Sequence, residues 1–171
     1  MIQLARNVPE LNLQPGELHL ARSPMVLQTI LGSCVGVTFW SKRFCAGALC
    51  HGILPTVPKN WPANASPMEG HRYVDFSIQY LAREFDALGA CRSEVEVKVF
   101  GGSDVLPVAE MRGAKPTIGA LNSQTALEVL EAEGFHVLAY DLGGKRGRKI
   151  HFDTGTGVVT VYKLSAWSES P

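Results

Sequence analysis

The stretch TILGSCVGVTFW, residues 29–40, decides the fold of this chain together with CAGALCHGILP, residues 45–55. Apolar residues alternate along the first stretch at Val35, Val37 and Phe39. This period of two is typical of a strand with one buried face. The second stretch is a short apolar run that ends at a proline. We therefore predict two adjacent strands, with Cys34 and His51 near their ends.

Outward from this pair, the pattern predicts further strands at residues 17–22, 25–31, 93–102, 135–144, 149–152 and 158–164. An apolar face predicts a helix over residues 71–88, closed by Gly89, and a second helix follows over residues 123–133, with Asn122 as its N-cap. This order of elements predicts an α/β fold. We expect a single-domain layered sandwich, residues 1–171, in which a mixed β-sheet packs against two main α-helices.

Charge and composition narrow the classes of function. Sixteen basic and sixteen acidic residues cancel, which argues against a partner recruited by bulk charge, such as a long nucleic acid. The N-terminal residues lack the apolar run of a secretory signal, and no stretch approaches the roughly 20 apolar residues of a membrane helix. We therefore expect a cytoplasmic protein without membrane insertion, whose four cysteines stay free.

A long loop is predicted at residues 56–70, directly after the strand that carries His51. The segment TVPKNWPANASPMEG holds three prolines and has no periodic apolar pattern. Loops of this length within compact domains are often lids or binding loops. Trp61 in this loop could grip a protein substrate, or it could pack the loop down onto the domain.

Cys34 and His51 form the candidate chemical site. Gly32 permits a tight turn that would leave backbone N–H groups near the Cys34 sulfur, and His51 could reach the same edge. An imidazole and N–H groups stabilise a thiolate, which is the nucleophilic form of cysteine. The arrangement is consistent with a nucleophilic cysteine, but a buried cysteine beside a structural histidine is the alternative.

A metal site is the weaker interpretation of the same region. Cys45, Cys50 and His51 offer ligand atoms, but a structural zinc site needs four ligands, and no second cysteine pair with suitable spacing exists. We therefore expect no metal, and we expect Cys45, Cys50 and Cys91 to fill the core. On a strand, Cys50 and His51 face opposite sides, so only one of them can face a cleft.

The two strand motifs closely resemble those of the chemoreceptor glutamine deamidase family, CheD. In TILGSCVGV and AGALCHGILP, the histidine follows the cysteine by seventeen residues, as in that family. VFGGSDVL, IGALNSQTALEVLEAEG and DLGGKRGRKIHFDTGTGVVTVYKL resemble further motifs of the family in the same order. The resemblance covers a deamidase-like core of about residues 16–164, leaving N- and C-terminal tails.

The resemblance implies roles for individual residues. Cys34 would be the nucleophile and His51 the general base and acid, without a cofactor. The family also carries an active-site threonine shortly before the cysteine, six residues ahead in some members, where this chain has Gln28, whereas Thr29 lies five ahead. A shift of one residue reverses the face of a strand. The third residue is therefore Thr29, Gln28 or a backbone carbonyl, in that order of preference.

Substrate contacts are expected around the same turn. Backbone N–H groups near Ser33 and Cys34 are candidates for the oxyanion hole, so we expect Gly32 and Ser33, with Trp61, to bind substrate. The basic run GGKRGRK, residues 143–149, admits three interpretations: a solvated hairpin, a surface that docks an acidic receptor, or a nucleic-acid contact.

The expected function is hydrolytic deamidation of glutamine side chains on bacterial chemoreceptors, which serves chemotaxis adaptation. The resemblance also implies a CheC-type phosphatase as a binding partner. Two alternatives stay open: a noncatalytic module that binds receptor or phosphatase, and a receptor methyl-esterase that uses the same thiol.

Overall fold

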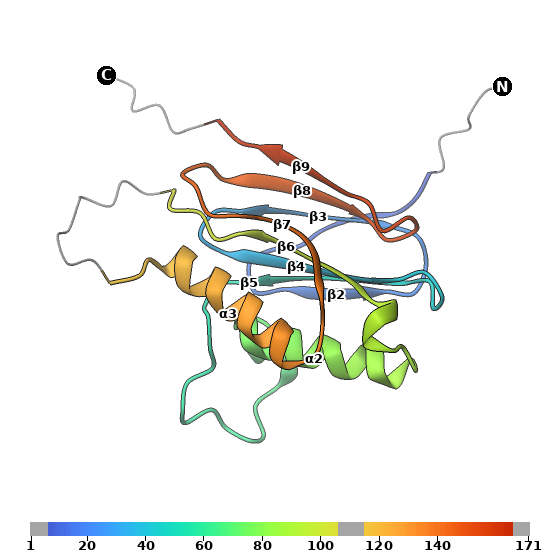
Figure 1. Cartoon of the computed structure of the whole chain (residues 1–171), viewed down its shortest axis with the longest axis horizontal. Helices are drawn as coiled ribbons and strands as arrows, with labels where there is room; N and C mark the ends of the chain where they lie inside the picture. Colours follow the sequence, from blue (N-terminus) through green and yellow to red (C-terminus); the bar gives the residue numbers. More distant parts are fainter. Residues whose placement is uncertain (1–6, 106–114, 166–171) are drawn as a thin grey trace.

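Two β-sheets stacked face to face and a layer of helices make up the described part of the chain, residues 7–105 and 115–165 of this computed structural model (Figure 1). The larger sheet has the order β2 (Leu18–Ala21), β5 (Ala46–Gly52), β4 (Val35–Ser41), β6 (Glu96–Gly101) and β7 (Val137–Leu142). The smaller sheet has the order β1 (Glu10–Asn12), β3 (Val26–Leu31), β8 (Arg148–Asp153) and β9 (Val159–Lys163). Both sheets are mixed, because β6–β7 and β1–β3 are parallel and the other pairs antiparallel.

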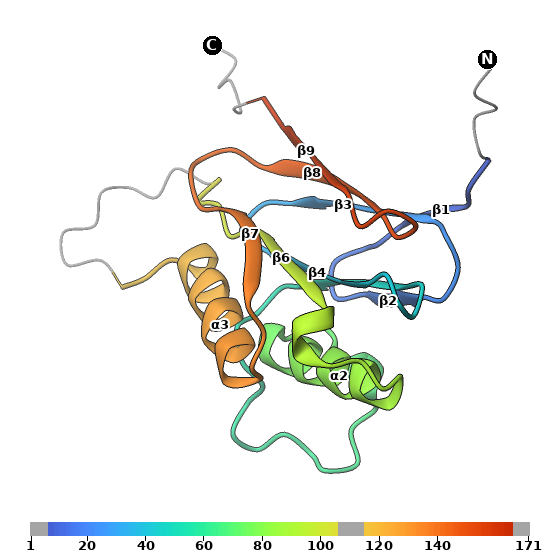
Figure 2. The same cartoon turned by 45° about the vertical axis from the view of Figure 1, so that its right-hand side comes forward.

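The helices lie on the side of the larger sheet that faces away from the smaller sheet (Figure 2). They are α2 (Val74–Ala87) and α3 (Ile118–Ala132), with the short α1 (Pro67–Gly70) and a 3-10 turn at Arg92–Glu94. The predicted layered α/β fold is confirmed. The prediction of one mixed sheet is wrong, because β3, β8 and β9 pair with one another and with β1 in a separate layer.

Two apolar cores separate these layers. Val35, Val37 and Phe39 of β4 pack toward α2 and α3, as the alternation predicted. The opposite face of β4 meets the smaller sheet, and a Cβ atom added at Gly36 would lie only 3.0 Å from the Leu31 side chain. This close approach allows side chains of the two sheets to touch.

The helix boundaries differ from the prediction at both N-termini. Helix α2 begins at Val74 rather than at residue 71, because the chain first forms α1 and a turn. Helix α3 begins at Ile118, and its N-cap is Thr117, whose hydroxyl accepts a hydrogen bond from Ala120 N at 3.2 Å. Asn122 therefore lies inside α3 and is not a cap, contrary to the prediction. Neither these helices nor any other in residues 7–105 and 115–165 has the length and apolar character needed to cross a bilayer.

The cysteines are all free, but only one of the three expected in the core is there. Cys50 is buried in the helix-side core. Cys45 and Cys91 are exposed, which contradicts the expectation that they fill the core. Cys45 lies in the turn between β4 and β5 with a φ of 49°, and Cys91 lies between α2 and the 3-10 turn, so neither belongs to the alternating part of a strand. The predicted tails, residues 1–6 and 166–171, lie outside the described residues.

Candidate active site

Cys34 and His51 lie on one face of the larger sheet. Cys34 directly precedes β4, and the antiparallel β4–β5 register places Gly36 opposite His51. Since directly opposed residues share a face, and so do residues two apart on a strand, Cys34 and His51 both face the smaller sheet. Cys34 accordingly packs against the core between the sheets. Diagonal neighbours of this kind are about 7–8 Å apart at the backbone, which an imidazole can span.

Thr29 reaches the same imidazole from the smaller sheet. It lies fully buried in β3, and its Oγ1 is 2.7 Å from His51 Nδ1 and 2.8 Å from the Leu13 carbonyl oxygen. Gln28 instead donates from its Nε2 to a Glu10 carboxylate oxygen at 3.3 Å. The structure therefore brings Thr29, rather than Gln28, against His51.

The hydrogen-bond network assigns the tautomer of His51. A hydroxyl carries one proton, and the Leu13 carbonyl can only accept, so Thr29 Oγ1 donates to Leu13 and accepts from His51 Nδ1–H. A neutral His51 then carries its lone pair on Nε2. This atom is buried and has no hydrogen-bond partner among the described residues. His51 is thus arranged to accept a proton at Nε2.

Burial keeps both groups of this pair uncharged at neutral pH. Desolvation lowers the pKa of His51 to about 4, against an opposing effect of the Glu17 charge. Desolvation also raises the pKa of the Cys34 thiol, opposed by the backbone N–H of Cys34 itself. At rest the Cys34 thiol and the His51 imidazole are therefore both neutral.

The turn at residues 32–34, called the Cys34 turn below, is bound to the end of β6. Gly102 N donates to the Cys34 carbonyl and Ser103 N to the Gly32 carbonyl, both at 2.9 Å. Gly101 has a φ of 105°, and a Cβ atom there would lie 2.2 Å from the Cys34 carbonyl oxygen. The end of β6 therefore lies directly against Cys34.

Asn122 of α3 contacts the same turn. The side chain is fully buried, and its Nδ2 donates to the Ser33 carbonyl at 3.0 Å and to the Ile53 carbonyl at 2.9 Å. Ile53 lies two residues after His51. A single amide group thus joins the Cys34 turn to the end of the His51 strand.

Arg148 of β8, in the smaller sheet, is buried and binds the backbone around Gly101 and Gly102 at the end of β6, called the Gly101 corner below. Arg148 Nη1 donates to the carbonyls of Gly101 at 2.6 Å and Asp141 at 2.8 Å, and Nη2 donates to the Gly143 carbonyl at 2.7 Å. Its guanidinium also pairs with the Asp141 carboxylate at 3.6 Å. The interpretation of the basic run as a solvated hairpin is therefore wrong for Arg148, because the β8 register turns this side chain inward.

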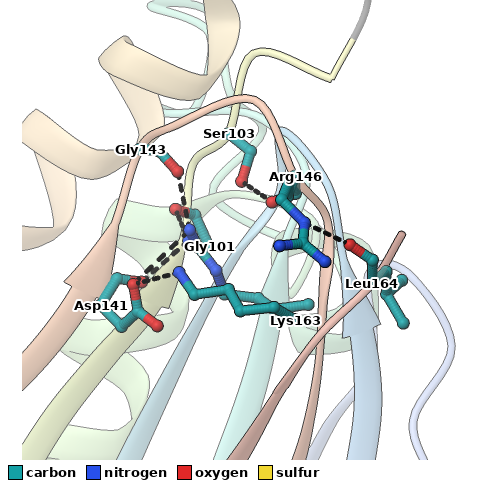
Figure 3. Close-up of polar contacts among 8 residues, drawn as sticks. Gly101, Ser103, Asp141, Gly143, Arg146, Lys163 and Leu164 are labelled. Carbon is teal, nitrogen blue, oxygen red and sulfur yellow. Dashed lines mark hydrogen bonds and ion pairs between the residues drawn. The ribbon is translucent and has the colours of Figure 1, made fainter. Parts of the chain in front are cut away.

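The neighbouring polar contacts of this region appear in Figure 3, where Ser103 lies above Gly101 and donates its hydroxyl proton to the Arg146 carbonyl at 2.8 Å. Arg146 Nε donates to the Leu164 carbonyl at 2.6 Å, and Lys163 pairs with Asp141 at 2.8 Å. Arg146, an exposed residue of the basic run, is thus hydrogen-bonded to Ser103 just after β6 and to Leu164 just after β9.

Trp61 lies half-buried in the loop after β5 rather than free in solvent. Its ring meets Tyr73 edge-on, with 5.3 Å between ring centroids. Trp61, Arg72 and Tyr73 line an open hollow of about 420 Å³, and Ile53 N donates to the Arg72 carbonyl at 2.8 Å. The hollow is therefore joined to the C-terminal end of the His51 strand.

Sequence reasoning missed Arg148 and the bridging role of Asn122. A signal for Asn122 was present, because Asn122, Ala126 and Leu130 are buried at intervals of four residues on one face of α3. A polar residue in such an apolar stripe requires an internal hydrogen-bond partner. In the part of the chain that the structure describes, no group of three or more His, Cys, Asp or Glu residues could hold a metal ion.

A family model and several relatives match this chain over most of its length. The family model described as CheD chemotactic sensory transduction matches residues 53–163. A Geobacter sulfurreducens protein named probable chemoreceptor glutamine deamidase CheD 2 is 40% identical over 158 residues, 92% of this chain and 92% of the relative. Proteins named probable chemoreceptor glutamine deamidase CheD are 34% identical in Maridesulfovibrio salexigens, covering 96% of this chain and 97% of the relative, and 34% identical in Pseudomonas fluorescens, covering 89% and 83%.

Proposed function

This chain belongs to the CheD family, and on that premise we propose that it hydrolyses glutamine side-chain amides of chemoreceptors to glutamate and releases ammonia in chemotaxis adaptation. The names of its relatives support the substrate and the reaction. The contact of 2.7 Å between Thr29 Oγ1 and His51 Nδ1 carries the proposal, because it leaves Nε2 as a base on the face that Cys34 shares.

The proposed reaction begins with proton transfer from the Cys34 thiol to His51 Nε2. The sulfur attacks the carboxamide carbon of the substrate, and the amide oxygen becomes an oxyanion in the tetrahedral intermediate. Protonated His51 gives its proton to the amide nitrogen, the carbon–nitrogen bond breaks, and ammonia leaves a thioester behind. His51 then takes a proton from water, whose oxygen attacks the thioester. The carbon–sulfur bond breaks, glutamate leaves, and His51 returns the proton to the sulfur, which restores the thiol.

Thr29 holds the imidazole in the tautomer that this reaction requires. Its hydroxyl oxygen accepts the Nδ1 proton and stabilises the imidazolium formed after proton transfer, as the third residue of a triad does. A neutral resting pair fits this scheme, because proton transfer and attack on the carbonyl carbon can then occur together.

The substrate-binding part of the proposal rests on the Cys34 turn and the loop after β5. Backbone N–H groups at Ser33 and Cys34 would stabilise the oxyanion, and Gly32 keeps this side of the turn free of a side chain. Trp61 would contact the receptor surface next to the reacting glutamine. The hollow beside it supports this role, because it adjoins the strand that carries His51.

We place the reaction in the cytoplasm and treat the whole chain as one catalytic domain. The free state of all four cysteines supports a reducing compartment, in which a catalytic thiol stays active. A CheC-type phosphatase as a binding partner rests on the family resemblance alone. We propose no cofactor, since thiol and imidazole supply the nucleophile and the proton transfers.

Mass spectrometry of a chemoreceptor cytoplasmic fragment tests the proposal. Incubation with the protein should add about one dalton to each modified glutamine and release ammonia. Cys34→Ala should lower the rate by about a thousandfold or more, because the nucleophile acts as a unit with its base. Cys91→Ser removes an exposed thiol and is the matched control, with a rate close to that of the unchanged protein.

Three results would contradict the proposed reaction. Glutamine conversion that survives Cys34→Ala would exclude the cysteine mechanism. Binding of the fragment without any mass change would favour the noncatalytic module. Methanol release from a methylated fragment, with glutamine untouched, would favour the methyl-esterase.

A further inference from the structure

We propose that Asn122 is a positioning residue that fixes the oxyanion hole, by orienting the Ser33–Cys34 peptide so that the Cys34 N–H faces the substrate. This inference rests on the proposed deamidation. It assigns to a buried side chain of α3 a function in the reaction, although that side chain does not touch the substrate.

The orientation follows from the carbonyl contacts of the Cys34 turn. Ser33 O accepts from Asn122 Nδ2 at 3.0 Å, and Gly32 O accepts from Ser103 N at 2.9 Å. The described chain has no cis peptide bonds, and in a trans peptide the C=O and the following N–H point in opposite directions. With both carbonyls directed into the protein, the N–H groups of Ser33 and Cys34 are directed away from these partners, on the opposite side of the turn.

Helix α3 is built to deliver the Asn122 amide to this place. At Gly119, about one turn earlier, a Cβ atom would lie 2.7 Å from the carbonyl oxygens of Gly102 and Ser103. A side chain at this position would push the helix away from the end of β6. The close helix approach therefore allows the short Asn122 side chain to reach the backbone of Ser33.

The second bond of Asn122 links the turn to His51. Both Nδ2 protons are used, one on Ser33 and one on the Ile53 carbonyl at 2.9 Å. The amide therefore holds the peptide of the nucleophile and the end of the base-bearing strand at a set separation. Positioning of this kind contributes to rate because donors fixed in advance need no reorganisation during the reaction.

The unpartnered oxygen of Asn122 argues against a role in packing alone. Oδ1 is buried and has no hydrogen-bond partner among the described residues. A buried acceptor without a partner is unfavourable, and an apolar side chain of similar volume would avoid that cost. The two N–H donors, to the Ser33 and Ile53 carbonyls, therefore account for a polar side chain at this position.

Asn122→Leu and Asn122→Ala in a Cys45→Ser, Cys91→Ser background test this role. Both variants remove the two donors, Asn122→Leu with little change in volume and Asn122→Ala without a side chain that could clash. The background leaves Cys34 as the half-buried thiol available to iodoacetamide, since Cys50 is buried. We expect kcat for the receptor fragment to fall by about 10²–10³, the usual cost of a lost oxyanion donor. The KM and the rate of Cys34 alkylation should stay within about threefold, because alkylation forms no oxyanion.

Leu130→Ala is the matched control for damage to α3. Leu130 is buried in the same helix, two turns from Asn122, and packs in the helix-side core. It should lower the urea midpoint while kcat stays within about threefold of the background protein. Asn122→Ala keeps the experiment decisive if Asn122→Leu does not fold, and the urea midpoint of each variant identifies the folded ones.

The inference is overturned if a folded Asn122 variant keeps kcat within about threefold, or if alkylation of Cys34 falls in parallel with kcat. The second result would mean that the whole site has collapsed. Failure of the deamidase proposal is distinguishable, because the background protein itself would then leave glutamine unconverted, or Cys34→Ala would retain the conversion. Loss of activity in Cys34→Ala with full activity in Asn122→Leu would refute only the role of Asn122.

Discussion

One hydroxyl group decides which nitrogen of His51 can act as a base. Thr29 Oγ1 donates its proton to the Leu13 carbonyl and accepts from Nδ1–H, so Nε2 keeps the lone pair. Without this contact, the imidazole could adopt either tautomer and rotate. The proposed role of His51 as a base therefore depends on a residue from the other sheet.

Replacement of Thr29 by valine should reduce activity without removing the fold. Thr29→Val keeps the shape of the side chain but leaves His51 Nδ1–H and the Leu13 carbonyl without their partner. Loss of such hydrogen bonds costs about 1–3 kcal/mol, which corresponds to roughly a 5-fold to 160-fold lower kcat. Single-turnover deamidation of a receptor fragment measures the change.

Two further substitutions distinguish Thr29 from Gln28 as the residue that orients His51. Thr29→Ser retains the hydroxyl and should keep kcat within about fivefold of the unchanged protein. Gln28→Ala removes the side chain that contacts Glu10 and should leave kcat unaffected. A large loss in Gln28→Ala, with little loss in Thr29→Val, would reverse the assignment.

The low pKa of His51 predicts an unusual pH profile. The imidazole must be neutral to accept the thiol proton, and burial lowers its pKa to about 4. As the pH falls from 6.5 to 5, a histidine with an ordinary pKa of about 6.5 would become mostly protonated, with roughly a fifteenfold loss of its base form. We expect kcat/KM to stay nearly constant over this range and to fall only as the pH approaches 4.

Measurement of kcat/KM from pH 4.5 to 8 checks this expectation, with far-UV circular dichroism at each pH to confirm that the protein is folded. An acid limb with its midpoint near pH 6.5 would contradict the burial argument. Such a limb would mean that His51 has the ordinary pKa of a histidine, about 6.5.

At the scale of elements, the site depends on how the end of β6 meets the Cys34 turn. Gly101 and Gly102 have positive φ values of 105° and 63°, and the backbone of this corner donates to the Cys34 carbonyl. Position 101 requires glycine for two reasons: its φ is positive, and a Cβ atom there would lie 2.2 Å from the Cys34 carbonyl oxygen. The corner therefore determines where the Cys34 peptide can lie.

Gly101→Ala should displace the Cys34 turn and abolish most activity. The matched control is Gly144→Ala, because Gly144 also has a positive φ, of 76°, but nothing lies within 4 Å of an added Cβ. In both variants the left-handed conformation costs about 1–2 kcal/mol of stability. Only Gly101→Ala adds a clash, with the Cys34 carbonyl oxygen. Equal activity of the two variants would show that the corner does not position Cys34.

At the scale of the molecule, the candidate site joins the two sheets and the helix layer. Cys34 and His51 come with the larger sheet, Thr29 with the smaller sheet and Asn122 with α3 (Figure 1). Arg148 crosses between the sheets to bind the carbonyls of Gly101, Asp141 and Gly143. Stacking of the layers is therefore a condition for assembling the site.

Arg148→Met should destabilise the protein strongly. It preserves apolar volume but removes the donor to three backbone carbonyls, and each buried acceptor left without a partner costs about 1–3 kcal/mol. Asp141 is partly exposed and keeps its pairing with Lys163, so the loss comes from the carbonyls. Arg146→Met, on the exposed neighbour, should change stability by less than about 1 kcal/mol. Urea titration gives both free energies of unfolding, and similar values would refute a bridging role for Arg148.

Local pattern was sufficient for much of this protein. Alternation along residues 34–40 and the short apolar run over residues 45–55 predicted β4 and β5 as neighbours. The apolar stripe predicted α2 up to its first turn, and motif resemblance indicated the CheD family. These features depend on residues that are close in the sequence.

Contacts between distant segments were decided only by the tertiary structure. The sequence by itself determined the strands that carry Cys34 and His51, but the stacking of two sheets decided that Thr29 meets His51, and the close approach of α3 decided that Asn122 binds Ser33 and Ile53. Burial of Arg148 is of the same kind. A sequence pattern records which face of an element is apolar, whereas hydrogen-bond partners depend on the packing of elements far apart in the chain.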